Sequence, residues 1–135
     1  MVRNLLNTMS RKKSVLIIDD EEDFSHFLKL NLENTGRFKV FTASDGQAGV
    51  KLVQRKRPDV VLLDIMMPGM DGFEVLEKIK GNVKTYEIPV IMLTALDNKE
   101  CRSEARGSFA GEYLVKPVPL DRLISTIDRV SIYGQ

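Results

Sequence analysis

The chain has 135 residues, of which 43% are apolar and 29% are charged, and its formal net charge is +1 at neutral pH. This length suits a single domain with a hydrophobic core, and the near-neutral charge argues against a nucleic-acid-binding protein, which would need a basic face. A single cysteine, Cys101, excludes an internal disulfide and a cysteine-cluster metal site, and a single histidine, His26, argues against a zinc site or a histidine-based catalytic triad.

The predicted elements begin after an N-terminal leader at residues 1–12 with a series of short apolar runs. Three of these runs are continuous, which is typical of strands that are covered on both faces in a parallel sheet. A weaker run at residues 38–41 alternates between apolar and polar positions, which favours an edge strand. In chain order, the expected strands lie at residues 15–18, 38–41, 60–63, 90–93 and 113–115.

Helical patterns of apolar residues occupy the intervals after the strands. The fourth interval is the weakest, because residues 97–108 offer a stripe of only Cys101 and Ala105, extended by Phe109, and Gly107 interrupts it. A short, frayed helix and a well-formed one are both compatible with this segment. The other stripes are Phe24, Phe27, Leu28 and Leu32; Ala48, Leu52 and Val53; Val75, Leu76 and Ile79; and Leu120, Leu123, Ile124 and Ile127.

The strand–helix unit therefore occurs five times, which predicts an α/β domain with right-handed crossovers over residues 13–131, followed by a tail at residues 132–135. No run approaches the length of a membrane span, and the start of the chain lacks the apolar stretch of a signal peptide. We therefore expect a cytoplasmic protein that makes no contact with a membrane and does not bind nucleic acid directly.

Polar side chains follow four of the expected strands at their carboxyl ends. Because the carboxyl ends of parallel strands share the edge of the sheet at which ligands bind, we expect these side chains to meet in one cleft. Taken singly, each has a simpler interpretation as a turn former, a helix cap or a solvated charge. The residues are Asp19, Asp20, Asp64, Thr94 and Lys116.

Three of these five side chains are carboxylates, which repel one another when they lie close together. Two unit charges about 4 Å apart cost about 4 kcal/mol at an effective dielectric constant near 20, so the cluster predicts a bound cation. Oxygen ligands alone select a hard ion, most naturally Mg²⁺. Lys116 adds a fixed positive charge, so that such a site could receive a phosphoryl group.

Four motifs in this order resemble the receiver domain of two-component response regulators, including the chemotaxis receivers. The resemblance spans residues 13–130 and implies a flavodoxin-like (βα)5 fold, with a doubly wound, parallel, five-stranded sheet of order 2-1-3-4-5. The motifs are Leu16-Ile17-Ile18-Asp19-Asp20-Glu21, then Leu63-Asp64-Ile65-Met66-Met67-Pro68-Gly69-Met70-Asp71-Gly72, then Leu93-Thr94-Ala95, and finally Tyr113-Leu114-Val115-Lys116-Pro117.

The resemblance also implies a role for each residue of the acidic cluster. Asp64 would be the phosphoacceptor, a carboxylate nucleophile that becomes an acyl phosphate. Asp20 would bind Mg²⁺ directly, Asp19 would bind it mainly through water, and the backbone carbonyl of Met66 would be a further ligand. Catalysis would be confined to the chain's own phosphorylation and slow autodephosphorylation, so we do not expect an enzyme.

Further residues are implied to bind the phosphoryl group and to relay its presence. Lys116 would pair with Asp64 and then with the phosphoryl oxygens, while the Thr94 hydroxyl and the Ala95 amide would donate to other phosphoryl oxygens. Tyr113 would then swing from an exposed to a buried position and act with Thr94 as the switch. The Lys116–Pro117 peptide bond is expected to be cis by the same resemblance.

The implied function is a phosphorylation-dependent signalling switch that accepts a phosphoryl group from a phosphohistidine donor. The donor would be a sensor histidine kinase or a histidine phosphotransfer protein, docking on the helix after the first strand. The output would be a downstream protein target or a second copy of the chain, bound through the fourth helix, the fifth strand and the fifth helix. His26 and Cys101 are interpreted as ordinary surface and half-buried residues, and Asp71-Gly72 as the turn and cap before the third helix.

Two departures from the family pattern and two competing functions remain. Phe109 replaces the usual glycine after the fourth helix, so Gly107 or Gly111 could take over its turn. Met66 and Leu96, the positions that tune phosphoryl lifetime in the family, have side chains that cannot orient a water molecule by hydrogen bonding, which predicts slow autodephosphorylation.

Two other functions compete with the signalling switch. A Mg²⁺-dependent phosphohydrolase with an aspartyl-phosphate intermediate would need an Asp where Met66 stands, and a non-phosphorylated pseudo-receiver would not need all five site residues.

Overall fold

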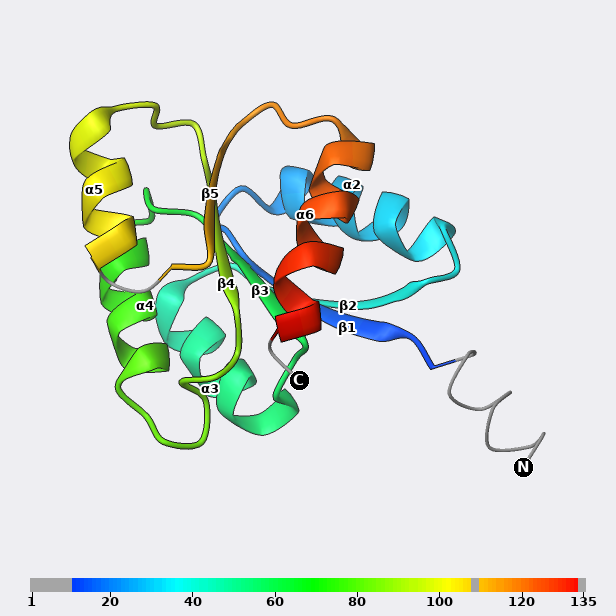
Figure 1. Ribbon diagram of the computed structural model, residues 1–135, viewed down its shortest axis with the longest axis horizontal. Helices are drawn as coiled ribbons and strands as arrows, with labels where there is room; N and C mark the ends of the chain where they lie inside the picture. Colours follow the sequence, from blue (N-terminus) through cyan, green and yellow to red (C-terminus); the bar gives the residue numbers. More distant parts are fainter. Residues whose placement is uncertain (1–10, 108–109, 134–135) are drawn as a thin grey trace.

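Five strands alternate with helices along the chain in the structure, a computed structural model that describes residues 11–107 and 110–133 (Figure 1). Residues 1–10 of the predicted leader and residues 134–135 of the predicted tail lie outside the described residues, whereas residues 132–133 of that tail belong to helix α6. In chain order the elements are β1 Lys13–Ile18, α2 Glu22–Asn34, β2 Phe38–Ala43, α3 Gly46–Lys56, β3 Val60–Leu63, α4 Gly72–Lys80, β4 Val90–Thr94, α5 Lys99–Gly107, β5 Glu112–Val115 and α6 Leu120–Tyr133.

All strand pairs are parallel, and the sheet has the order β2-β1-β3-β4-β5. The predicted doubly wound, flavodoxin-like α/β fold is therefore confirmed. The continuous apolar run of β3 is buried at every position, because helices cover both faces of the sheet there. In β2, Lys39 and Thr42 are exposed between neighbours that are buried or half-buried, which is the pattern of an edge strand.

Helices α2 and α6 cover one face of the sheet, and α3, α4 and α5 cover the other (Figure 1). Each fully buried Leu or Ile stabilises the fold by about 1.5–3 kcal/mol through removal of its side chain from water. The first face buries Leu28 and Leu32 of α2 together with Leu123 and Ile127 of α6; the second buries Val53 of α3, Val75, Leu76 and Ile79 of α4, and Ala105 of α5.

The weak helix α5 is formed over nine residues. Its first turn is capped by the Asn98 side chain, which accepts a hydrogen bond from the Cys101 amide at 2.7 Å. Ala105 is its one buried residue within the described part of the chain. The Asn98 cap therefore stabilises a helix that buries few apolar side chains.

The turn after α5 differs from expectation. Neither Gly107 nor Gly111 has a positive φ, so the hypothesis that one of them replaces the family's turn glycine is wrong. Instead, the Ala110 amide donates to the carbonyl of Ala105 at 3.0 Å, and the Gly111 amide donates to that of Val90 at 2.8 Å, which leads the chain directly into β5. Phe109 lies outside the described residues.

Candidate functional site

Three aspartates converge at the carboxyl ends of β1 and β3. Asp19 and Asp20 follow β1 directly, and Asp64 follows β3, so that the parallel pairing of these strands places them side by side. One carboxylate oxygen from each of the three lies within 4.8 Å of the others. Asp19 and Asp64 are only 2% and 5% exposed, whereas Asp20 is exposed to solvent. The sequence-based expectation that these three carboxylates lie close together is therefore met by the structure.

The position of Asp64 is fixed by close packing of the backbone around it. Its amide donates to the carbonyl of Ile18 at 3.0 Å, and the Gly72 amide donates to that of Ile65 at 2.9 Å. A Cβ atom at Gly72 would lie 2.3 Å from the Asp64 carbonyl oxygen, so only glycine fits at this point. Asp71 caps α4 by accepting from the Glu74 amide at 3.0 Å, which confirms the predicted turn and cap.

Lys116 reaches this cluster from the end of β5. Its ammonium group lies 2.6 Å from Asp19 Oδ2, 3.2 Å from Glu21 Oε1 and 3.6 Å from Asp64 Oδ2. The first two contacts are hydrogen bonds, and the third is an ion pair at longer range. The lysine side chain is only 12% exposed, and the peptide bond between Lys116 and Pro117 is cis.

Burial and charge act in opposite directions on the two members of the closest ion pair. Burial raises the pKa of Asp19, against the hydrogen bonds from Lys116 and from the Glu21 amide. Burial alone would lower the pKa of Lys116, but its hydrogen bond to Asp19 and the charges of Asp19 and Asp64 raise it overall. The lysine therefore stays charged, whereas burial makes the charged form of Asp19 less favourable than it is in water, a cost that a bound cation would reduce.

Thr94 and Tyr113 are joined through a single residue of the loop after β4. The fully buried Thr94 hydroxyl accepts a hydrogen bond from the Leu96 amide at 3.3 Å, so it does not cap α5. The Leu96 carbonyl in turn accepts from the Tyr113 hydroxyl at 2.7 Å. The guanidinium of Arg102, which is paired with Asp97, lies 4.8 Å from the centre of the Tyr113 ring. Burial raises the pKa of Tyr113.

The donor set fits a hard divalent cation. Three carboxylates lie together, and the only histidine and cysteine of the chain are elsewhere. One oxygen of Asp64 accepts from the Met66 amide at 3.3 Å, which leaves its second oxygen toward Lys116. The Met66 side chain is 59% exposed beside this site, and the Ala95 residue, whose amide was predicted to bind phosphoryl, is also exposed.

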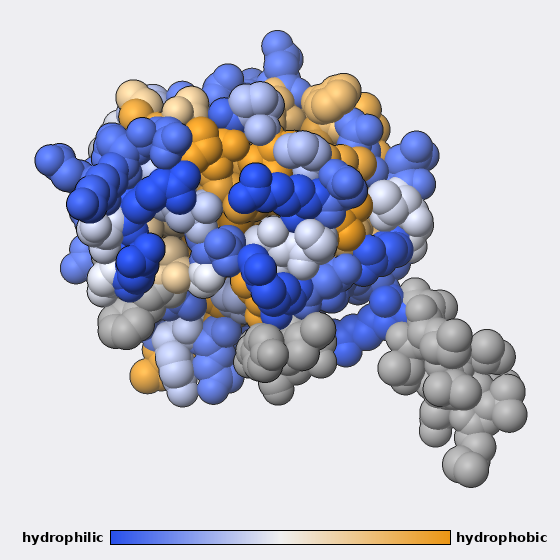
Figure 2. Space-filling view, turned by 45° about the horizontal axis from the view of Figure 1, so that its top comes forward, coloured by the Kyte–Doolittle hydropathy of each residue, from blue (hydrophilic) through white to orange (hydrophobic). Residues whose placement is uncertain are grey.

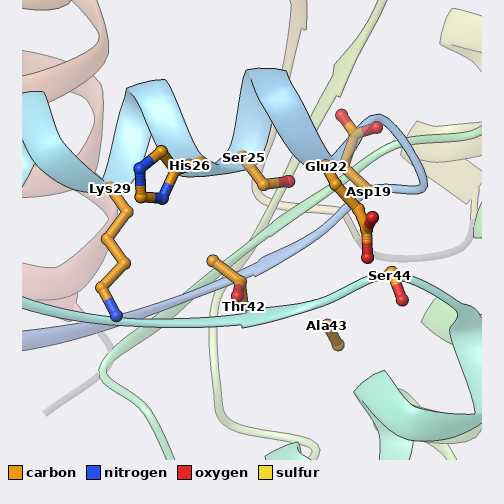
Figure 3. Close-up of a pocket in the computed structure, with 8 residues that line it drawn as sticks. All are labelled: Asp19, Glu22, Ser25, His26, Lys29, Thr42, Ala43 and Ser44. Atoms are coloured by element: carbon orange, nitrogen blue, oxygen red, sulfur yellow. The ribbon is translucent and has the colours of Figure 1, made fainter.

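A polar hollow of about 370 Å³ extends from Asp19 between α2 and the end of β2. Figure 3 shows Asp19 and Glu22 at one end of this hollow and Lys29 at the other. His26 lies on the exposed side of α2 between these ends, in agreement with its interpretation as a surface residue. The acidic site is therefore open to water on this side.

A second hollow of about 360 Å³, which we call the apolar groove, lies between α2 and the start of α6. Figure 2, which turns the top of the molecule toward the viewer, shows hydrophobic surface gathered in the upper part of the view and bordered by hydrophilic side chains. Phe27 is 68% exposed although it belongs to the apolar stripe of α2. The groove is lined by Phe24, Phe27, Leu28, Asn31, Leu93, Lys116, Pro117, Val118, Leu120 and Leu123.

All five polar residues singled out in the sequence thus lie at one edge of the sheet, but two neighbours of Lys116 were missed. Glu21 follows the aspartate pair in the first motif, but no role was predicted for it. Its position directly after two carboxylates was the signal that could have indicated a contact with Lys116. Phe24 was assigned to the core stripe of its helix, yet its ring lies 4.0 Å from the Lys116 ammonium. Nothing in the local sequence distinguishes it from an ordinary core aromatic.

Comparisons with known proteins agree with this geometry. A family model described as the response regulator receiver domain matches residues 15–128. The chemotaxis protein CheY4 of Vibrio cholerae is 31% identical with a TM-score of 0.83, over 89% of this chain and 99% of that one. The receiver domain of the Francisella response regulator 1452 is also 31% identical, with a TM-score of 0.82, over 92% and 100% of the two chains.

A CheY-like response regulator receiver domain protein from Methanospirillum hungatei is 27% identical, with a TM-score of 0.85, over 92% of this chain and 97% of that one. The similarity in these three cases extends over nearly the whole length of both partners. Within the part of the chain that the structure describes, no helix combines the length and the apolar character needed to cross a bilayer.

Proposed function

The chain belongs to the response regulator receiver family, whose members act in phosphorylation-dependent two-component signalling, and we propose that it accepts a phosphoryl group on Asp64 from a phosphohistidine donor. The observation that carries this proposal is the position of Asp64 between two further aspartates and the Lys116 ammonium. A nucleophile, a place for a divalent cation and a fixed positive charge are thus gathered around one buried carboxylate.

In the proposed reaction, an oxygen of the ionised Asp64 carboxylate attacks the phosphorus atom of the donor. The O–P bond forms as the N–P bond to the donor imidazole breaks, and the electron pair leaves with the imidazole nitrogen, which takes up a proton. The product is an acyl phosphate. No general base is required, because a carboxylate oxygen attacks without first giving up a proton.

Mg²⁺, when bound, supplies positive charge that offsets the charge of the phosphoryl oxygens. We assign Asp20 and Asp64 as direct ligands, the Met66 carbonyl as a further one, and Asp19 as a ligand acting mainly through water. The Lys116 ammonium, which is paired with Asp64, would then pair with a phosphoryl oxygen. The Thr94 hydroxyl and the Ala95 amide would donate hydrogen bonds to other phosphoryl oxygens. Lys116 is close to Asp64 already, so this step needs only a small movement.

The proposed output is a change in the surface formed by α5, β5 and α6. Thr94 and Tyr113 share Leu96 as a hydrogen-bonding partner, so movement of the Thr94 hydroxyl toward a phosphoryl group alters the contact that holds Tyr113. Tyr113 lies on β5 against Arg102 of α5, which transmits the change to the surface. A downstream protein target, or a second copy of the chain, would bind there.

We further propose that the phosphodonor, a sensor histidine kinase or a histidine phosphotransfer protein, docks in the apolar groove. The groove presents the exposed ring of Phe27 and ends at Lys116, so a partner seated in it would hold its phosphohistidine close to Asp64. Exposed apolar surface of this kind is typical of sites for protein partners.

The test is incubation of the chain with acetyl phosphate and Mg²⁺, followed by intact mass spectrometry. We expect the gain of one phosphoryl group in the wild type and none in Asp64→Asn, which keeps the size of the side chain. Steady hydrolysis of acetyl phosphate with many turnovers would instead identify a phosphohydrolase. No change in mass with any small phosphodonor would identify a pseudo-receiver, and either result would overturn the proposal.

A further inference from the structure

The Lys116 ammonium has an aromatic neighbour in addition to its three carboxylates. It lies 4.0 Å from the centre of the Phe24 ring, which belongs to the first turns of α2. Phe24 is half-buried, and the lysine side chain is 12% exposed. A cation over an aromatic face is attracted by the ring quadrupole, and the attraction grows as the cation loses water. Because the Lys116 ammonium is largely shielded from water, its attraction to the Phe24 ring is stronger than it would be at an exposed site.

The carboxylates around Lys116 pull its ammonium in different directions. Asp19 and Asp64 are buried at the floor of the site, whereas the Glu21 side chain is 64% exposed and lies toward solvent. An ammonium group has three protons, and two of them are used by Asp19 and Glu21. The flexible four-carbon stem of a lysine allows the group to follow either partner.

We propose that Phe24 is a positioning residue that holds the Lys116 ammonium within reach of Asp64 and of a phosphoryl group on it. The ring face binds the ammonium and covers it from water, which opposes the outward pull of Glu21. Phe24 takes no part in bond formation. This inference rests on the proposed function, because it concerns how quickly the same site takes up a phosphoryl group.

The alternative is that Phe24 only fills space in the core under α2. A leucine would fill much of that space without an aromatic face, and a tyrosine or tryptophan would keep the face. If Phe24 only fills space, the effect of removing its ring should not depend on the charge of Glu21. If Phe24 opposes the pull of Glu21, the effect should become smaller when that charge is removed. The variants below test these two differences.

The experiment compares phosphorylation rates with acetyl phosphate and Mg²⁺ in the wild type, Phe24→Leu, Phe24→Tyr and Phe24→Trp. We expect Phe24→Leu to be roughly three- to tenfold slower, from the usual strength of such contacts, and the aromatic variants to recover most of the rate. The matched control is Phe41→Leu, which removes a ring of β2 that faces two other lysines, Lys39 of the same strand and Lys56 at the end of α3. It should keep the wild-type rate.

Two further measurements separate positioning from packing. Adding Glu21→Gln to Phe24→Leu should restore part of the rate, because the competing outward charge is gone. In the unphosphorylated protein, the ε-methylene protons of Lys116 should show the upfield NMR shift of a group over a ring in the wild type and in Phe24→Tyr, and lose it in Phe24→Leu.

The inference is overturned if Phe24→Leu reacts at the wild-type rate, if Phe24→Tyr is as slow as Phe24→Leu, or if the Lys116 protons of the wild type are unshifted. If even the wild type takes up no phosphoryl group on Asp64, the proposed function fails. The NMR shifts then decide by themselves whether Phe24 holds Lys116.

Discussion

The Tyr113 hydroxyl donates a hydrogen bond of 2.7 Å to the backbone carbonyl of Leu96. The amide of the same Leu96 donates to the buried hydroxyl of Thr94. A group in the centre of the site and an aromatic side chain on β5 are therefore connected through one backbone unit. If Thr94 moves on phosphorylation as proposed, we expect the acceptor that holds Tyr113 to move with it.

Tyr113→Phe should remove this connection while keeping the ring. We expect the free energy of unfolding to fall by about 0.5–1.5 kcal/mol, the usual contribution of one hydrogen bond. Beryllofluoride, which imitates the phosphoryl group, should then shift the NMR signals of residues 94–97 in the variant but those of β5 much less than in the wild type. Equal shifts on β5 in both proteins would show that the signal takes another route.

Leu96→Glu should shorten the life of the phosphorylated state. Neither Met66 nor Leu96 has a side-chain group that could orient an attacking water, so the wild type is expected to lose its phosphoryl group slowly. The glutamate offers an acceptor for such a water beside Thr94. The half-life is measured by intact mass after removal of the phosphodonor; an unchanged half-life in the variant, or a short one in the wild type, would contradict this view.

Gly72→Ala should damage both stability and the site. The added methyl group would lie 2.3 Å from the Asp64 carbonyl oxygen and 2.7 Å from the Ile65 Cα, and these backbone atoms cannot yield without moving Asp64. Overpacking of this kind costs about 1–3 kcal/mol. Gly107→Ala is the control, since its Cβ would meet no atom of the described residues within 4 Å. Urea denaturation and the acetyl phosphate rate test both expectations.

Asp19→Asn should stabilise the metal-free protein at neutral pH. Because burial raises the pKa of Asp19 in the folded state, the folded protein binds its proton more tightly than the unfolded one, and stability falls as the pH rises through that raised pKa. The variant lacks this loss. Urea midpoints measured in EDTA should therefore favour the variant at pH 7, and its advantage should shrink as the pH falls toward the ordinary aspartate pKa of about 3.9. An advantage that does not change with pH would point to a different cause.

Phe27→Ala should weaken the use of a protein phosphodonor. Phe27 presents the largest exposed apolar side chain in the apolar groove, so its loss removes contact area for a docked partner. Transfer from a phosphorylated histidine phosphotransfer protein should slow by at least tenfold, while the reaction with acetyl phosphate, which needs no docking, should slow by a much smaller factor. Equal slowing of both reactions would place the defect in the site and not in docking.

The strands of the sheet were largely predictable, because a strand that is covered by helices on both faces has a continuous run of apolar residues. The run at residues 60–63 coincides with β3, since both faces of that strand are buried and every position must be apolar. The expected end of β2 was too early, because Thr42 is a polar residue on an edge strand and lies outward. The expected start of β1 was too late for a similar reason, because its first two residues, Lys13 and Ser14, are polar and only partly buried.

The site was predictable as far as it depends on topology. Parallel strands bring Asp64 and Lys116 to one rim whatever the details of packing. The contact between Phe24 and Lys116 depends instead on how α2 lies against the loop after β5, and the sequence does not encode that angle in any local pattern. Helix α5 could not be distinguished from a frayed helix in the sequence, because only one of its residues is buried and its apolar stripe is therefore weak.

The two ends of the ion pair between Lys116 and Asp19 are 97 positions apart in the chain. A ribosome adding about 5–20 residues per second makes Asp19 and Asp20 roughly 5–20 s before it makes Lys116. During that interval Lys116 is absent, and β5, the last strand, has not yet joined the edge of the sheet. We therefore expect a chain that stops short of residue 116 to lack the ammonium group that pairs with Asp19 and Asp64.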